Sequence, residues 1–201
     1  MAITINGTGT ITGISAGGLP DNCVTAADIE SSLDLTGKTV TLPSGTGGKV
    51  LNVWQVNKTD QQIINSTSYQ TIMSQTLTPA SASSKFLIIT SVSACSQTTD
   101  VTMGYFSLFK GTDELLRGDA SGNRPRTYAS LNVTSNEMVP LTLQYLDSPA
   151  TTDEITYSVQ CRRNNSNANT EVWINRTDHH RDVGGNYDPV GASTFTIMEI
   201  G

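Results

Sequence analysis

The chain has 201 residues, of which 36% are hydrophobic and 15% are charged, and its net charge at pH 7 is −6. Typical globular domains have ~25% charged residues, and here Thr, Ser and Asn, about a third of the chain, take their place. The negative charge argues against an extended phosphate-binding face for nucleic acid, but it leaves a local basic patch open. The most apolar run, KFLIITSVSAC, has the length of a strand and is shorter than the ~18 residues of a membrane span.

The first part of the chain, residues 1–48, is rich in Gly, Thr and Ser, with single apolar residues between them. Residues 3–14 alternate as in a strand, but their glycines weaken any isolated strand. Residues 24–35 predict one short helix, in which Thr25 is the N-cap and Asp28 stands three residues later. A helix of this length is marginal alone, so we expect residues 1–48 to be an extended arm that binds a partner.

The remainder, residues 49–201, predicts one all-β domain, because short runs of alternating apolar and polar residues are separated by Gly, Pro, Asn and Asp. We expect no helix longer than one turn there, and strands with this spacing favour an antiparallel β-sandwich or jelly roll. The predicted strands are 49–57, 68–77, 85–95, 101–110, 113–117, 126–133, 138–146, 154–163, 170–176 and 193–200.

An antiparallel sandwich leaves open edges and exposed apolar strips unless something covers them. An arm that pairs readily, attached to such a domain, is an efficient route to a symmetric homo-oligomer. We favour three-fold symmetry, although the sequence pattern does not fix the number of copies.

Two groups of arginines are candidate basic patches, and we expect both to be solvated loop residues. Three cysteines at wide spacing predict no disulfide framework and no metal site, and the two in apolar runs are expected to be buried free thiols. The arginines are Arg117, Arg124 and Arg126 in one group and Arg162, Arg163, Arg176 and Arg181 in the other, and the cysteines are Cys23, Cys95 and Cys161.

No catalytic, cofactor-binding or metal-binding residue is predicted, and the protein is not expected to be an enzyme. Adjacent histidines in a strand point to opposite faces and chelate poorly within one chain, although Asp178, Asp182 or other copies could complete a metal site. Paired carboxylates keep a glycosidase dyad open, but they occupy turn positions, where acids are common. The histidines are His179 and His180, and the pairs are Asp113-Glu114 and Asp153-Glu154.

Several other residues could bind a ligand. Arg117-Gly118-Asp119 spells the integrin-binding tripeptide, although a three-residue match occurs easily by chance. Trp54 and Trp173 lie in predicted strands and are expected in a core or an interface. Tyr128, Tyr187 and the Asn-rich loop 164–169 are weak candidates for contact with a polar ligand.

Several segments of the sequence resemble virion proteins of tailed bacteriophages, particularly those that infect cyanobacteria and other aquatic bacteria. The arm phrase GGLPDNCVTAADIESSLDLTGKTVTLPSG is similar to a common N-terminal stretch of these proteins. The resemblance continues through GGKVLNVWQVNKTD, LTPASASSKFLIITSVS, YFSLFKGTDELLRGDASGNR, PLTLQYLDSPATTDEITYSVQCR and STFTIMEIG, and it covers nearly the whole chain.

This resemblance implies a non-enzymatic virion structural protein with a C-terminal β-sandwich head that is often trimeric, like tumour-necrosis-factor heads. Residues 1–46 would attach it to other virion proteins, and head loops would contact a bacterial surface glycan as a short tail fibre or adhesin. The chain lacks the shaft of long fibres, so a capsid decoration (cement) protein remains an alternative, and a glycan depolymerase is a third. With no secretion signal at MAITINGTGT, we expect the protein to be made in the host cytoplasm, with no cofactor and no membrane insertion.

Overall fold

The computed structural model describes residues 49–96, 102–133, 137–165, 170–179, 181 and 188–201, and this part of the chain is all-β. Residues 47–201 form one unit by their internal contacts, and this unit begins directly after Thr46. The predicted arm, with its strand-like residues 3–14 and its helix at 24–35, lies outside the described residues, so its boundary at residue 48 stays a prediction. The strands are β1 Val50–Lys58, β2 Gln62–Ile64, β3 Gln70–Leu77, β4 Lys85–Ser96, β5 Gly104–Lys110, β6 Asp113–Glu114, β7 Ala129–Leu131, β8 Val139–Asp147, β9 Ile155–Arg163, β10 Val172–Ile174 and β11 Ser193–Ile200.

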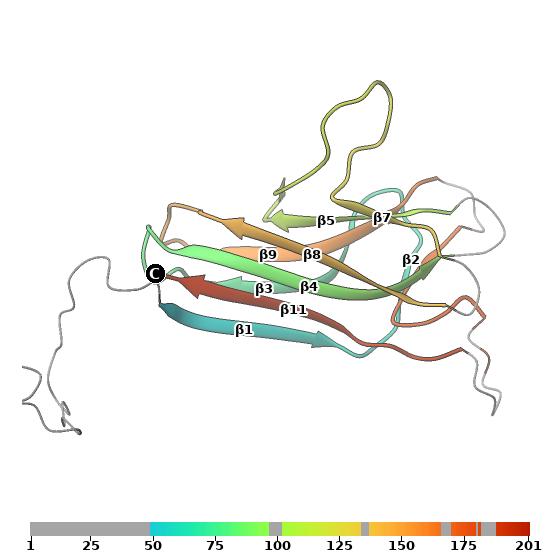
Figure 1. The fold of residues 1–201 in the computed structure, drawn as a ribbon, viewed down its shortest axis with the longest axis horizontal. Helices are drawn as coiled ribbons and strands as arrows, with labels where there is room; N and C mark the ends of the chain where they lie inside the picture. The colour runs from blue at the N-terminus through green and yellow to red at the C-terminus, as the bar shows by residue number, and fades with distance from the viewer. Residues whose placement is uncertain (1–48, 97–101, 134–136, 166–169, 180, 182–187) are drawn as a thin grey trace, which may run out of the picture. The chain divides into compact units, whose positions relative to one another are not determined.

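The strands form two antiparallel sheets in a sandwich-like arrangement (Figure 1). In the first sheet, strand β4 pairs with β8 on one side, and on its other side with β11 along its first part and with β10 at its end. Strand β1 continues this sheet beyond β11, and β2 continues it beyond β10. The second sheet has the order β3-β9-β5, with β6 and β7 both pairing with β5.

The core lies between the sheets because alternate residues of each strand turn inward. On β9, the predicted face of Ile155, Tyr157, Val159 and Cys161 is confirmed, since all four are buried. Phe86 of β4 meets Tyr157 across the two sheets, with ring centroids 5.8 Å apart. The same mixture of aliphatic and aromatic side chains continues along the strands and gives the described residues one shared core.

The predicted strands correspond to observed ones, and one strand was missed. Strand β2 has only three residues, too few to show a period-2 pattern, and it is held by pairing with β10. The prediction at 113–117 is too long, because the chain leaves the sheet after Leu115, whose amide donates to the Leu108 carbonyl. No helix occurs in the described residues, as expected for this part of the chain.

Two buried carboxylates lie between the strands at the end of the sandwich where β1 begins. Glu199 is fully buried and accepts hydrogen bonds from the Asn52 side chain (2.7 Å) and the Ala80 amide (2.6 Å). Asp147 accepts a hydrogen bond from the Tyr157 hydroxyl (2.6 Å) and pairs with Lys110 (3.2 Å). Because Asp147 ends β8 and Tyr157 lies in β9, this cluster joins the two sheets.

Candidate functional site

The outer face of the first sheet carries a row of apolar side chains that crosses four strands. Val53 of β1 pairs with Met198 of β11, Met198 with Leu87 of β4, and Leu87 with Leu146 of β8. Cross-strand partners share one face of a sheet, and the neighbouring residues Phe86 and Ile197 are fully buried on the opposite face. We call Val53, Met198, Leu87 and Leu146 the apolar row.

The apolar row is open to solvent in the described part of the chain. Val53 is 59% exposed and Leu146 is 50% exposed, while Leu87 and Met198 are partly buried between them. Val50, 57% exposed, extends the apolar surface toward the start of β1, where residues 1–48 join the domain. A contiguous group of exposed apolar side chains on one face of a sheet is a candidate for contact with another molecule.

The same face becomes polar toward its other end. One cross-strand row there consists of hydroxyl and amide side chains, and it takes one residue from each of the same four strands. The apolar surface is therefore confined to the end near the start of β1, and Lys85, at the start of β4, is a charged residue beside it on the same face. The polar row is Asn57, Thr194, Ser91 and Thr142.

A long loop between β6 and β7 projects from the body of the sandwich (Figure 1). We call residues 115–128 the finger, and each residue from 116 to 125 is exposed. Its base is paired, since the Gly118 amide donates to the Thr127 carbonyl (3.2 Å), and its tip is a turn in which the Arg124 amide donates to the Ser121 carbonyl (3.2 Å). Gly122 has a φ of 56° in that turn, a conformation that glycine adopts without strain.

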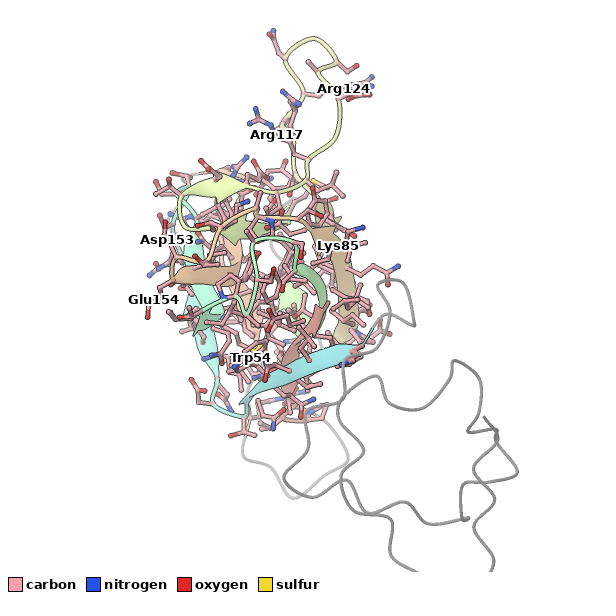
Figure 2. The ribbon with its side chains drawn as sticks, turned by 90° about the vertical axis from the view of Figure 1, so that its left-hand side faces the viewer. Trp54, Lys85, Arg117, Arg124, Asp153 and Glu154 are labelled. Atoms are coloured by element: carbon pink, nitrogen blue, oxygen red, sulfur yellow. The ribbon has the colours of Figure 1, made fainter. Side chains whose placement is uncertain are left out.

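The three arginines of the finger have different surroundings. Arg126 is partly buried and its Nε donates to the Gly118 carbonyl (2.6 Å), so this side chain holds the base together. Arg117 is half exposed and lies 3.7 Å from the Glu114 carboxylate. Arg124 is exposed and makes no ion pair among the described residues, and in Figure 2 it lies on the projecting loop, away from the sheets. The prediction of solvated arginines is therefore confirmed for Arg117 and Arg124.

The integrin-type tripeptide lies at the base of the finger instead of its tip. Gly118, the central residue, is paired through its amide with Thr127 and through its carbonyl with Arg126. These bonds fix the backbone on which Arg117 and Asp119 stand, whereas the tip is formed by residues 121–124. The geometry gives no support to adhesion through this tripeptide.

The second group of arginines does not form a basic patch. Arg162 lies over the rings of Tyr69 and Tyr105, 5.4 and 4.6 Å from the ring centroids. The others are each held separately. The prediction of solvated loop arginines is wrong for Arg162 and Arg163, which lie in β9, whereas Arg181 is an exposed loop residue, as predicted. Arg163 donates to the Thr170 carbonyl (2.6 Å), Arg176 lies over the Trp173 ring, and Arg181 pairs with Asp188 (2.7 Å).

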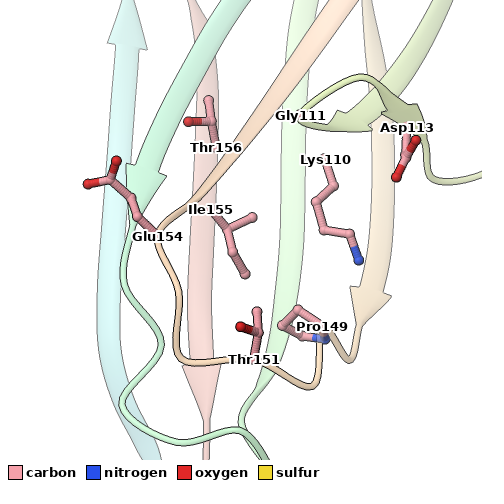
Figure 3. Close-up of a pocket in the computed structure, with 8 residues that line it drawn as sticks. All are labelled: Lys110, Gly111, Asp113, Pro149, Thr151, Glu154, Ile155 and Thr156. Carbon is pink, nitrogen blue, oxygen red and sulfur yellow. The ribbon is translucent and has the colours of Figure 1, made fainter.

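The paired carboxylates lie in separate surroundings. Glu114 is largely buried in a hydrogen-bonded cluster with Ser107, Tyr69 and Arg117. Asp113 and Glu154 line opposite sides of a shallow pocket of about 250 Å³, and Glu154 points away from it (Figure 3). Figure 3 therefore shows no two carboxylates facing each other across this pocket.

The cysteines and histidines offer no assembled centre in the described residues. Cys95 and Cys161 are buried and not joined in a disulfide, as predicted, and burial raises the pKa of each thiol. His179 is exposed, and no three His, Cys, Asp or Glu side chains of the described residues come together as a possible metal site. Cys23, His180 and Asp182 lie outside the described residues.

The aromatic candidates have structural contacts. Trp173 is buried, although it is not part of the cluster between the sheets, and Trp54 packs against Phe86 of that cluster, so both tryptophans have buried structural contacts, as predicted. The Tyr128 hydroxyl donates to the Gln144 carbonyl (2.7 Å) and accepts from the Gln144 amide (3.1 Å). Tyr187 and most of the loop 164–169 lie outside the described residues.

Comparison with known proteins does not place the chain in a family: no family model and no curated protein matches it. The described residues contain no helix that is both long and apolar enough to span a bilayer.

The apolar row and the finger are the functional features that sequence reasoning did not assemble. The row was hidden because each of its residues comes from a different strand and is visible only once the register is known. A signal for the finger was present in RGDASGNRPR, whose arginines were singled out. The sequence alone does not show that Arg126 holds the base, that Arg124 lies at the tip and that Arg117 lies near Glu114, because these positions depend on the fold.

Proposed function

We propose that the protein is a non-enzymatic structural component of a tailed-bacteriophage virion, built as a trimer and acting as a short tail fibre or adhesin. Residues 1–46 attach it to other virion proteins, and loops of the head contact the host surface. The observation that carries this proposal is the apolar row, an exposed surface that a soluble monomer rarely leaves open. The resemblance of the chain phrases to phage virion proteins supplies the biological setting.

The strand order supports a jelly-roll head of the tumour-necrosis-factor type. Eight strands follow the order β1-β11-β4-β8 in one sheet and β3-β9-β5-β7 in the other. This order arises when a four-pair β-ribbon wraps into two facing sheets, the arrangement of jelly rolls. Strands β2, β6 and β10 are short additions to this plan.

A second copy of the chain is the partner that best fits the apolar row. The chain carries a net charge of −6, so most of its surfaces repel each other. The apolar row has no charged member, and identical faces can approach there without like-charge repulsion. Burial of Val53 and Leu146 around a three-fold axis would remove from water the side chains that are most exposed on this face.

The copy number of the protein in purified virions tests the proposed role and separates its two forms. Quantitative mass spectrometry that finds tens of copies or fewer per particle supports a tail fibre, and hundreds of copies support a capsid decoration protein. Absence from purified particles would contradict both. Clearing of host polysaccharide by the isolated protein, lost in Glu154→Gln, would replace them with a depolymerase.

A further inference from the structure

The finger is held as a defined shape where it joins the body. Thr127 donates through its hydroxyl to the Phe106 carbonyl (2.8 Å), and Tyr128 is bonded to both backbone groups of Gln144. With the paired base and the turn at Ser121–Arg124, these bonds fix both ends of the projecting segment. A loop ordered in this way presents side chains at a low entropic cost of binding.

The finger is basic although the chain is acidic. Its exposed part carries two guanidinium groups, Arg117 and Arg124, and one acid, Asp119, and Arg117 also lies 3.7 Å from the Glu114 carboxylate where the finger begins. Arg126 serves the base through Gly118 and is not available in the same way. A local positive potential on a protein of net charge −6 attracts anionic ligands to this one place.

We propose that Arg117 and Arg124 bind the carboxylate or phosphate groups of an acidic polysaccharide. Guanidinium groups match these planar and tetrahedral anions with two parallel hydrogen bonds, which a lysine does not provide. The neutral side chains beside them, Ser121 and Asn123, are exposed and suited to sugar hydroxyl groups. This inference rests on the proposed function, because it names the chemistry of the surface that the head contacts.

The weakness of single contacts is consistent with this role. An exposed charge pair contributes little by itself, so one finger would bind only weakly. Several fingers on an oligomer, facing a polymer with repeated anionic groups, convert weak contacts into strong overall binding. The ligand is therefore expected to be a polymer instead of a single sugar.

The test measures binding of the full chain to immobilised polysaccharides by biolayer interferometry. Polygalacturonate presents carboxylates, yeast phosphomannan presents phosphates, and dextran is neutral. We expect binding to one or both anionic polymers, none to dextran, and a steep loss between about 0.05 M and about 0.5 M salt. The polymer that binds more tightly identifies which anion the finger prefers.

The double substitution R117Q/R124Q is expected to weaken binding by about tenfold or more in apparent affinity. K49Q/K85Q is the matched control, because it removes the same charge from exposed residues on the body, and we expect it to change affinity by less than about twofold. Thermal unfolding and solution mass, unchanged in both variants, show that folding and assembly are preserved.

Three results would overturn the inference: no binding of the native chain to either anionic polymer, equal loss in both double variants, or equally tight binding to duplex DNA. Each leaves the proposed structural role intact if the protein remains a trimer and is found in virions. Failure of the proposed function itself would appear as absence from virions, which polysaccharide binding does not measure.

Discussion

Glu199 is the clearest case of a single residue that stabilises the fold through charge. It is fully buried on β11, between β1 and the segment that precedes β4. Burial by itself raises the pKa of this carboxyl, but hydrogen bonding, with that from Asn52 the strongest, lowers it by more, and the pKa lies below its usual value. The ionised form is therefore the one that stabilises the folded domain.

Glu199→Gln is expected to lower the free energy of unfolding by about 1–3 kcal/mol near neutral pH, because an amide cannot accept from both donors as a carboxylate does. Since the pKa is lowered in the folded state, the contribution of Glu199 is present above the unfolded pKa and is lost as the pH falls through the folded pKa. The difference between native protein and variant should shrink in acid. Urea unfolding across a pH series measures it.

The control for this substitution is Asp153→Asn, which neutralises an exposed carboxylate. We expect it to change stability by less than about 0.5 kcal/mol. A difference between native and Glu199→Gln proteins that grows in acid would contradict the assigned role of Glu199.

The sequence predicts that Glu199 points inward, but it does not predict the partners of Glu199. In STFTIMEI, the alternation places Glu199 on the same face as Phe195 and Ile197, so its inward direction could be predicted. Its partners could not, because Asn52 lies 147 positions and Ala80 119 positions away along the chain. Contacts of that separation depend on which strands become neighbours, which local pattern does not determine.

At the scale of elements, β8 is an edge strand whose outer backbone groups need protection. Tyr128, at the base of the finger, donates to the Gln144 carbonyl and accepts from the Gln144 amide, and so satisfies two of them. An edge with free backbone groups invites pairing with other chains. The finger is thus connected to the first sheet as well as to the second, in which β6 and β7 lie.

Tyr128→Phe is expected to loosen the finger with little effect on the rest of the domain, because it removes both bonds to Gln144. Global stability should fall by about 1 kcal/mol. Hydrogen exchange at the amides of Gly118 and Arg124 should become faster, while exchange in β4 stays slow. Unchanged exchange in the finger would contradict this account of how its base is fixed.

Strand positions followed from alternation and breakers, whereas strand partners and the finger did not. The run STFTIMEI predicted β11 at the observed residues, because alternation is a property of neighbouring residues. The finger begins within the predicted strand 113–117, and nothing in DELLR signals that pairing stops after two residues. The pairing of β6 ends because the earlier residues of β5, from Gly104 to Phe106, pair with β7 instead.

At the scale of the whole molecule, we propose that residues 1–46 attach the protein to the virion and that the domain after them folds by itself. The core that holds the described residues together is formed within residues 54–197. We expect such a domain to bury enough apolar surface to fold without the first 46 residues. Attachment and folding should then be separable.

Removal of residues 1–46 is expected to leave a folded, soluble head whose melting temperature changes by less than about 3 °C. The same truncated protein, made in host cells, should no longer join the particles of an infecting phage that lacks the full-length gene. Circular dichroism and mass spectrometry of purified particles measure the two effects. Normal incorporation of the truncated head would contradict the anchor assignment.

The most direct test of the account is the solution mass of the full chain, measured by light scattering coupled to size-exclusion chromatography. We expect three times the 21.4 kDa of one chain for the native protein, and a single-chain mass for V53D/L146D, which places charges in the apolar row. N57D/T142D is the matched control, because it adds the same charges to the same two strands at the polar end of the face, and it should keep the mass of three chains. A native protein with the mass of one chain, or a V53D/L146D variant that assembles like the native protein, would contradict the account.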